Sequence, residues 1–334
     1  GDAGHATDGY IGRYDLNMNL VFEYALDSGA VAGGAVTSED KLFAVALDDD
    51  GHAATVGQGG ESPVPTFWVH EYDELGIEAW SNPYTYTDGI SSAWQMATGV
   101  DIDNDSVWTT GTGQRDGVVN GRWLSFRHDT LTGAVNLTNV TYDAGQNTDA
   151  MDEAQGIAAW DDGTFVVVGA SGTDTDDADW HIRRYDSYGA LLFEFTEDGG
   201  FNLNDSAMSV AIEPTSGDIF VGGYINVGTN NAAGANDDWQ VIRFDLELTE
   251  LWRHTFETTA GASERVNAIA LDEDDDVLVA GYAIDATTGL KIWRLSELSE
   301  GDGTQLDGRT WPAGAGDMVL EGVAFGDGRV AVIG

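Results

Sequence analysis

The stretch Asp238-Trp239-Gln240-Val241-Ile242-Arg243-Phe244-Asp245 decides the fold, because variants of it return along the whole chain. Each copy has an aromatic residue, then a segment in which polar and apolar residues alternate, and an ending of the type Arg-aromatic-Asp. The copies end at Asp15, Asp73, Asp129, Asp186 and Asp245, and a sixth, degenerate copy ends at Ser296. An internal repeat of about 56 residues is typical of an architecture built from similar supersecondary units.

A second motif alternates with the first. It consists of small and apolar residues in alternation, an Asp, a polar turn and an apolar run that ends in Gly, as in residues 44–57 and 268–281. The closing glycines are Gly57, Gly111, Gly169, Gly223, Gly281 and Gly334. Both motifs therefore occur six times.

Each unit is predicted to hold four short strands. The second motif supplies strands one and two, the first motif supplies strand three, and an apolar stretch such as 191–195 supplies strand four. Turns such as Asp161-Asp162-Gly163 suit tight hairpins, and the period-two alternation with little helical periodicity favours an all-β fold. We expect a six-bladed β-propeller with four antiparallel strands per blade.

The chain begins within one unit, at strand three, and stops within another, at strand two. We therefore expect one domain over residues 1–334. The closing blade would combine about 318–334 with 1–25, pairing the C-terminal strands one and two with the N-terminal strands three and four. Such closure leaves no open sheet edge.

The units resemble the SBBP and delta-60 type repeats that build bacterial and archaeal propellers. The resemblance lies in stretches such as 205–212, 219–224 and 238–245, and it extends over essentially the whole chain. It implies the propeller fold and a secreted or cell-surface setting. It implies no particular reaction, because one fold hosts many functions.

The charge balance restricts the partners. The chain has 58 acidic and 14 basic residues, a formal net charge of -44. This charge repels nucleic acid and anionic membrane surfaces and attracts cations or a basic partner. Abundant Asp with only two lysines, Lys41 and Lys291, is typical of halophilic-like proteins. We expect an extracellular or cell-surface monomer.

Other features are excluded by composition. There is no cysteine, so disulfides and thiolate metal sites are excluded. No apolar run approaches the roughly 18 residues of a membrane helix, so membrane insertion is not expected. The histidines show no zinc motif, and G-x-S-x-G and P-loop motifs are missing.

Five of the 14 basic residues share one assigned repeat position: Arg13, Arg127, Arg184, Arg243 and Arg294. The favoured interpretation is structural, with each Arg paired to a carboxylate and lying over an aromatic ring. The alternative is a ring of arginines that binds an anion. Glu71 replaces Arg in one copy.

An acidic position precedes strand one, eight residues before its final acidic residue. It is assigned to Asp40, Glu153, Asp205 and Glu264, while Gln95 and Met318 break the pattern. First strands line the channel of a propeller, so these carboxylates would gather at one mouth and are candidate calcium ligands. The alternative is that each acid pairs with a repeat Arg. The loop containing Asp174, Asp176, Asp177 and Asp179 opens on the same face.

Three residues depart from the repeat near that mouth and are candidate ligand-binding residues: Trp94, Gln95 and Trp311. An exposed Trp beside carboxylates could serve as a platform for a sugar, and the alternative is packing. The run Asp101-Ile102-Asp103-Asn104-Asp105 begins like an EF-hand loop but lacks the required Gly and Glu, so it is interpreted as a hairpin turn.

These observations favour a non-catalytic binding or scaffold propeller with a protein or carbohydrate partner at the acidic mouth. One alternative is a calcium-assisted hydrolase or lyase that acts on a glycan or ester at the same mouth. The other is a purely structural repeat module. The catalytic residues of such an enzyme are unknown from the sequence.

Overall fold

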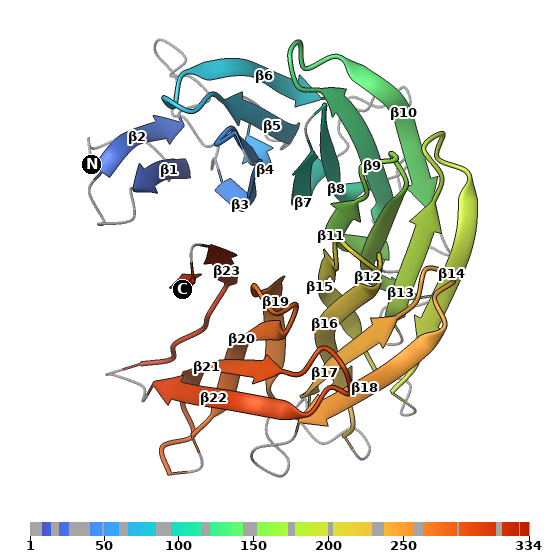
Figure 1. Ribbon diagram of the computed structural model, residues 1–334, viewed down its shortest axis with the longest axis vertical. Coiled ribbons are helices and arrows are strands. Elements are labelled where there is room, and N and C mark those ends of the chain that lie inside the picture. The colour runs from blue at the N-terminus through green and yellow to red at the C-terminus, as the bar shows by residue number, and fades with distance from the viewer. Residues whose placement is uncertain are drawn as a thin grey trace. The chain divides into compact units, whose positions relative to one another are not determined.

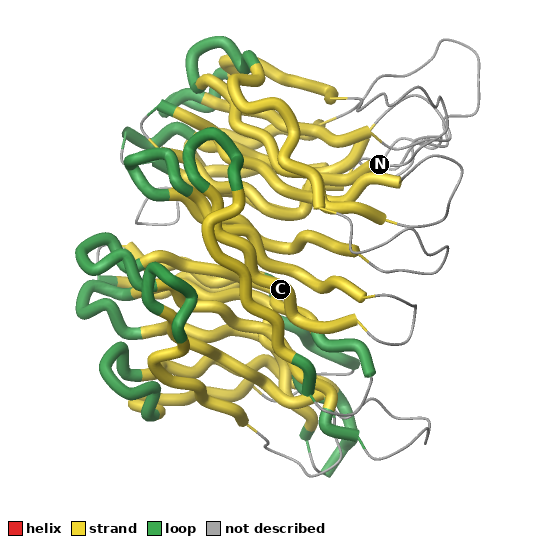
Figure 2. The backbone as a smooth tube through the Cα atoms, turned by 90° about the vertical axis from the view of Figure 1, so that its right-hand side faces the viewer, coloured by secondary structure: helices red, strands yellow, loops and turns green. Residues whose placement is uncertain are grey.

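The computed structural model describes residues 9–14, 20–26, 41–48, 50–59, 66–84, 95–103, 105–114, 121–142, 152–172, 178–199, 203–228, 237–256, 263–285, 287–311, 316–326 and 328–333. It comprises two compact units, Gly1–Asp161 and Asp162–Gly334. Among the described residues every regular element is a β-strand, and Figure 2 shows strands and loops without a helix. No described helix could cross a membrane.

The first unit contains eleven described strands (Figure 1), of which the first two form a two-stranded sheet. Two four-stranded antiparallel sheets follow, β3–β6 and β7–β10. The strands are β1(Gly9–Tyr14), β2(Leu20–Leu26), β3(Lys41–Leu47), β4(Ala53–Gly59), β5(Thr66–Tyr72), β6(Glu78–Tyr84), β7(Gln95–Asp103), β8(Ser106–Gln114), β9(Gly121–Asp129), β10(Val135–Tyr142) and β11(Asp152–Ala159).

The second unit begins with β12, β13 and β14, which pair in that order. The sheets β15–β18 and β19–β22 follow, and β23 pairs with β24. The strands are β12(Phe165–Gly172), β13(Ala178–Tyr185), β14(Leu191–Glu197), β15(Ser206–Ile212), β16(Ile219–Asn226), β17(Asp237–Phe244), β18(Glu250–Phe256), β19(Arg265–Leu271), β20(Val277–Ile284), β21(Lys291–Leu298), β22(Gln305–Trp311), β23(Gly322–Gly326) and β24(Arg329–Ile333).

The prediction of an all-β fold made of antiparallel four-stranded sheets is confirmed. Strand two is the most apolar strand and is buried throughout in β12 and β16, whereas β14 and β22 are largely exposed. The core lies between consecutive sheets, as where Val241 of one sheet packs with Val266 and Val279 of the next. The single-domain assignment, the count of six blades and the closing blade stay predictions.

The repeated glycine is required by a bulge in strand one. The register of β15 shifts between Ala207 and Ser209, and that of β19 shifts between Val266 and Ala268. At each bulge a strand-one carbonyl approaches strand two so closely that a Cβ on Gly223 or Gly281 would lie 2.1 or 2.0 Å from it. A side chain at this position is therefore sterically excluded.

The repeated Asp after strand three closes the turn to strand four. The Asp186 carboxylate accepts hydrogen bonds from the amides of Tyr188 and Ala190 at 2.9 and 2.8 Å, and Asp245 accepts equivalent bonds. Much of the abundant Asp is therefore part of the turn structure, because its short side chain can accept from amides two and four residues ahead.

Tryptophan N–H groups join consecutive sheets. The indole of Trp180 donates to the carbonyl of Tyr224 at 2.7 Å, and Trp239 donates to Tyr282 at 2.8 Å. These residues are strand-three members of the repeat, and both are buried. These two repeated Trp residues are therefore packing residues of the framework.

Candidate functional site

The acidic position before strand one ties its sheet to the preceding sheet. The amide of Asp205 donates to the carbonyl of Ala178 at 2.6 Å, and the amide of Glu264 donates to Asp237 at 2.6 Å. Met318, which breaks the acidic pattern, makes the same backbone bond to Lys291 at 3.0 Å. The position therefore has a backbone role that does not depend on a carboxylate.

The sequence assigned one member of this series to the wrong residue. Ala97, Ala154 and Ala207 are equivalent buried positions near the start of strand one, and Gln95 and Asp205 each lie two residues earlier. The corresponding residue of β11 is buried Asp152, whereas Glu153 is only partly buried. The error arose because Trp160 stands where the other copies have their final acid. Asp40 lies outside the described residues.

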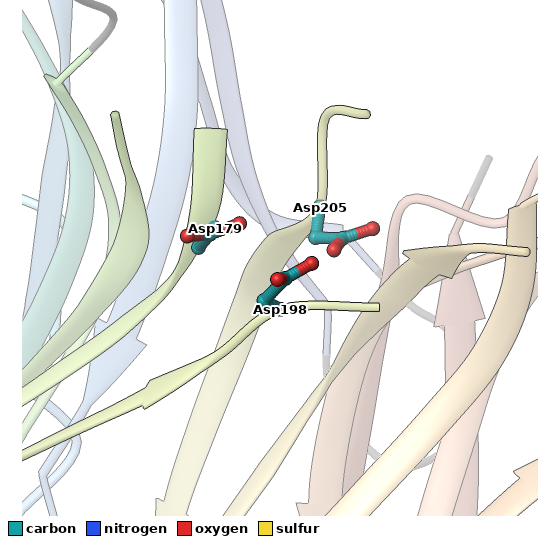
Figure 3. A group of neighbouring side chains, drawn as sticks. All are labelled: Asp179, Asp198 and Asp205. Atoms are coloured by element: carbon teal, nitrogen blue, oxygen red, sulfur yellow. The ribbon is translucent and has the colours of Figure 1, made fainter. Parts of the chain in front are cut away.

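Asp205 belongs to a group of three carboxylates in the second unit (Figure 3), the others being Asp179 and Asp198. Each offers one oxygen within 4.8 Å of the others. Asp179 is in β13, Asp198 follows β14, and Asp205 precedes β15, so three separate segments bring them together. Glu264 is not part of this group. Of the four predicted metal ligands, only Asp205 therefore lies in a described carboxylate group.

Asp205 is the buried member, with 1% of its surface exposed. Its carboxylate accepts hydrogen bonds from the amides of Gly199, at 2.7 Å, and Asn226. The pKa of Asp205 is raised to about 7, mainly by burial, with the two amide bonds opposing the shift and the charges of Asp179 and Asp198 adding to it. A cation beside the three oxygens would favour the ionised form.

A second carboxylate group, Asp272, Asp276 and Glu297, lies in the sheet β19–β22. Burial and the charges of Asp272 and Asp276 raise the pKa of Glu297. This group faces the strand turns rather than the strand starts, because Asp272 follows β19 and Asp276 precedes β20. It is therefore separate from the predicted mouth.

Two copies of the repeated Arg are structural residues that lie over an aromatic ring, and Arg243 also pairs with a carboxylate, as the favoured interpretation predicted. Arg243 forms an ion pair with Asp218 and lies 5.5 Å from the centre of the Phe220 ring. Arg127 donates to the hydroxyl of Ser106 at 2.7 Å and lies 5.0 Å from the centre of the Trp108 ring. The side chain of Arg13 lies outside what the structure describes.

The sixth copy of this motif was assigned to the wrong register. Gly281 pairs with Arg294, as Gly223 pairs with Gln240, so Glu297 and not Arg294 is equivalent to Arg243. Ser299 replaces the turn Asp, since its amide bonds the carbonyl of Thr304 as Asp245 bonds Thr249. Arg294 instead lies over the rings of Trp239 and Phe256.

Two of the candidate ligand-binding residues are not exposed as the hypothesis required. Trp311 is half-buried and meets Trp293 edge-to-face at 6.4 Å, as Phe256 meets Trp239 at 5.8 Å. Trp311 therefore occupies a repeat position in strand four and does not break the pattern. Gln95 is buried. Trp94 lies outside the described residues.

The EF-hand-like run forms the predicted hairpin. Strand β7 ends at Asp103 and β8 begins at Ser106, and these two residues pair. The Asp103 carboxylate accepts from the amide of Asp105 at 3.0 Å and from the indole of Trp108 at 2.9 Å. Its oxygens are therefore used within the hairpin.

Sequence reasoning missed two tryptophans of strand four. The indole of Trp80 donates to the carbonyl of Thr130 at 2.8 Å, and Trp252 donates to Glu300 at 2.8 Å. Each ring covers the positive-φ glycine of the next sheet's turn, Gly133 or Gly303, where a Cβ would lie 2.6 Å from the ring. An alignment anchored on strand four would have revealed them.

Comparison with known proteins supports the fold alone. No protein-family model matches the chain, and no curated protein matches it. An apocarotenoid oxygenase mutant from Synechocystis is 11% identical, with a TM-score of 0.50, covering 92% of this chain and 68% of that chain. The crystal structure of an ACO/RPE65 chimera is 12% identical, with a TM-score of 0.50, covering 90% and 67%. These neighbours are β-propeller-like.

A protein of unknown function from Bacteroides caccae is 14% identical, with a TM-score of 0.49, covering 88% of this chain and 86% of that chain. For the two structures with a TM-score of 0.50, at 11 and 12% identity, the likeness concerns architecture alone. The propeller-like fold expected from the repeats is thus supported, while membership of the SBBP and delta-60 group stays a prediction.

Proposed function

We propose that this chain is a non-catalytic binding or scaffold propeller of the SBBP and delta-60 type, secreted or displayed at the cell surface. The supporting observation is that its recurrent polar residues serve the framework. The repeated Asp, Arg and Trp close turns, pair across strands and join sheets. This leaves the variable ends of the strands to bind a protein or carbohydrate.

The proposed architecture is a ring of six blades in one domain. The two-stranded sheets β1–β2 and β23–β24 would combine into the closing blade, with β24 beside β1. Two exposed apolar surfaces support this arrangement. On β3 the side chains of Phe43, Val45 and Leu47 are 46, 56 and 63% exposed, and on β24 Ile333 is 64% exposed. A closing blade would cover both and remove their contact with water.

The face proposed for binding carries the starts of strands one and three. The group Asp179, Asp198 and Asp205 lies there in the second unit (Figure 3). We place the expected calcium ion at this group, because three carboxylates from separate segments match the oxygen ligands that Ca²⁺ prefers. The net charge of -44 favours a cation or a basic partner at this face.

Thermal unfolding tests the cation part of the proposal. The melting temperature is measured in EDTA, in millimolar CaCl₂ and in NaCl of matched ionic strength. A calcium-specific rise that is lost in Asp198→Asn supports the site, because a ligand bound to the folded state stabilises it by mass action. The control is Glu247→Gln, which neutralises an exposed acid in a turn of the same unit. An equal rise in NaCl contradicts the site and leaves a salt-adapted scaffold.

The enzyme alternative is a calcium-assisted hydrolase or lyase at the same face. The raised pKa of Asp205 would suit a general acid, but its two amide bonds hold the carboxylate in the framework. Turnover of p-nitrophenyl esters or glycosides that disappears in Asp205→Asn, with the fold kept, would favour this alternative over the scaffold.

A further inference from the structure

The sheet β3–β6 lacks the cation that the sheets β7–β10 and β15–β18 place across strands two and three. Arg127 donates to Ser106, and Arg243 donates to Asp218. The register makes Glu71 equivalent to these arginines, since Gly57 pairs with Trp68 as Gly223 pairs with Gln240. The equivalent of Asp218, five residues before that glycine, is His52. Glu71 and His52 thus occupy the positions that Arg243 and Asp218 hold in the sheet β15–β18.

Glu71 is deeply buried for a carboxyl group, with 3% of its surface exposed. One of its oxygens has no hydrogen-bond partner among the described residues. The carboxyl group also interacts with the side chain of Trp80 of β6, whose indole N–H donates to the carbonyl of Thr130. A buried carboxylate without full compensation destabilises a folded protein, because it has lost the hydration of its charge.

Charged residues of three segments act on Glu71. His52 precedes β4, Asp48 follows β3, and Asp129 ends β9 of the neighbouring sheet. Asp50 in the β3–β4 turn also acts on His52. Of these groups only His52 can carry positive charge, so the compensation of Glu71 depends on protons.

His52 is held in place by Asp48. The Nδ1 atom of His52 lies 2.8 Å from Oδ2 of Asp48, and its amide donates to Oδ1 at 2.8 Å. The hydrogen bond and charge of Asp48 raise the pKa of His52, with Glu71 and Asp50 adding to the shift and burial opposing it. Burial raises the pKa of Glu71 from 4.5 to about 7.

The pKa values of His52 and Glu71 are both higher in the folded protein than in the unfolded chain. The folded protein holds these protons more tightly than the unfolded chain, so their stabilising contribution is present in weak acid. It is lost as the pH rises through the folded pKa values, near 7 for Glu71 and above 6.5 for His52.

We propose that Asp48, His52 and Glu71 form a proton-dependent lock in the β3–β6 sheet, which holds in weak acid and loosens as the pH rises through neutrality. In acid, neutral Glu71 faces a charged His52–Asp48 pair. In alkali, a buried carboxylate faces Asp48 and Asp129 without a counter-charge. The Arg-based locks of Arg127 and Arg243 do not change over this range, because guanidinium stays protonated.

The experiment compares the whole chain with Glu71→Gln by denaturant unfolding between about pH 5 and about pH 8 at constant salt. The wild-type unfolding constant is expected to rise relative to that of Glu71→Gln by up to roughly a hundredfold across this range. Other titrating groups are common to both proteins and cancel in the ratio. The control Glu74→Gln removes an exposed acid of the same sheet's turn and should follow the wild-type profile.

A ratio that does not change with pH overturns the proposal. An NMR titration of the Glu71 carboxyl carbon in the wild-type chain provides a second test that needs no folded variant. A midpoint near 7 supports the lock, and a midpoint near the ordinary value of 4.5 overturns it.

Discussion

Arg243 donates from both Nε and Nη2 to one oxygen of Asp218, at 2.9 and 2.6 Å. The two side chains are only 12 and 13% exposed, so the pair lies largely away from water. Arg243 also donates to the carbonyl of Glu300 in the next sheet at 2.6 Å. One guanidinium thus connects strands two and three of its own sheet and then the sheet that follows.

Removing this cation is expected to destabilise the second unit. Arg243→Ala leaves Asp218 buried without its partner and should lower the free energy of unfolding by about 3 kcal/mol. Denaturant unfolding at neutral pH measures the loss. The control is Arg309→Ala, whose side chain is exposed and should change the free energy by less than about 0.5 kcal/mol. Equal losses in the two variants would contradict the structural role.

Restoring the missing cation in the next sheet should have the opposite effect. Glu297→Arg places a guanidinium beside Asp272 and Asp276 and relieves the repulsion among three carboxylates. We expect a gain of about 1 kcal/mol in unfolding free energy, reduced at high salt. Glu297→Gln is the neutral comparison and should gain less. A variant with Arg that is less stable than the one with Gln would refute the assigned register.

The repeat glycine offers a steric test. In Gly281→Ala the new Cβ would lie 2.0 Å from the carbonyl oxygen of Arg265, so the strand-one bulge must move. The expected loss is about 3 kcal/mol in thermal or chemical unfolding. Gly316→Ala meets nothing within 4 Å and is the matched control, with an expected change below about 0.5 kcal/mol. Similar melting temperatures for both variants would rule out the close approach.

Substitutions of Trp311 test whether this residue serves packing or forms a platform for a sugar. Trp311→Ala removes the edge-to-face contact with Trp293 and should lower the free energy of unfolding by about 2 kcal/mol, whereas Trp311→Phe should lose less than about 1.5 kcal/mol. Calorimetric unfolding of both variants measures this. An unchanged stability of Trp311→Ala, with loss of binding to a glycan array, would instead support the platform.

Much of the framework could be predicted because its determinants are local. Each repeated residue type meets a need at its own position. The glycine of strand two avoids a clash, the Asp after strand three closes a turn, and the alternating apolar residues cover one face of a strand. The structural role of Arg243 was also predictable. The chain has only 14 basic residues against 58 acidic ones, so an Arg that returns at one repeat position indicates a structural requirement at that position.

The errors arose where residue identity and backbone register differ. Trp160 stands in place of an acid, so counting from Asp161 moved the assignment from Asp152 to Glu153. The sequence assigns Arg294 as the repeat Arg of the sixth copy, but it lies three residues before Glu297, which is the residue equivalent to Arg243. Only the pairing of strands reveals such shifts.

The carboxylate groups could not be predicted from spacing. Asp179, Asp198 and Asp205 come from three segments, and their approach depends on how consecutive sheets stack. The burial of Glu71 likewise follows from packing against Trp80 and the neighbouring turn, which no local pattern encodes.

Closure of the ring is tested most directly by a designed disulfide, because the chain has no cysteine of its own. Val167 pairs with Arg183 and Val279 with Ser296, so the proposed closed ring would bring Val332 of β24 opposite Gly12 of β1. Val332→Cys with Gly12→Cys should oxidise to an intramolecular bond, seen as faster migration without reductant and stability to dilution. Val332→Cys with Ile11→Cys is the control, since neighbouring residues of a strand point to opposite faces. Bonding confined to the first pair is the result this account predicts. Failure of that pair to bond, or bonding only between molecules, would contradict the closed propeller.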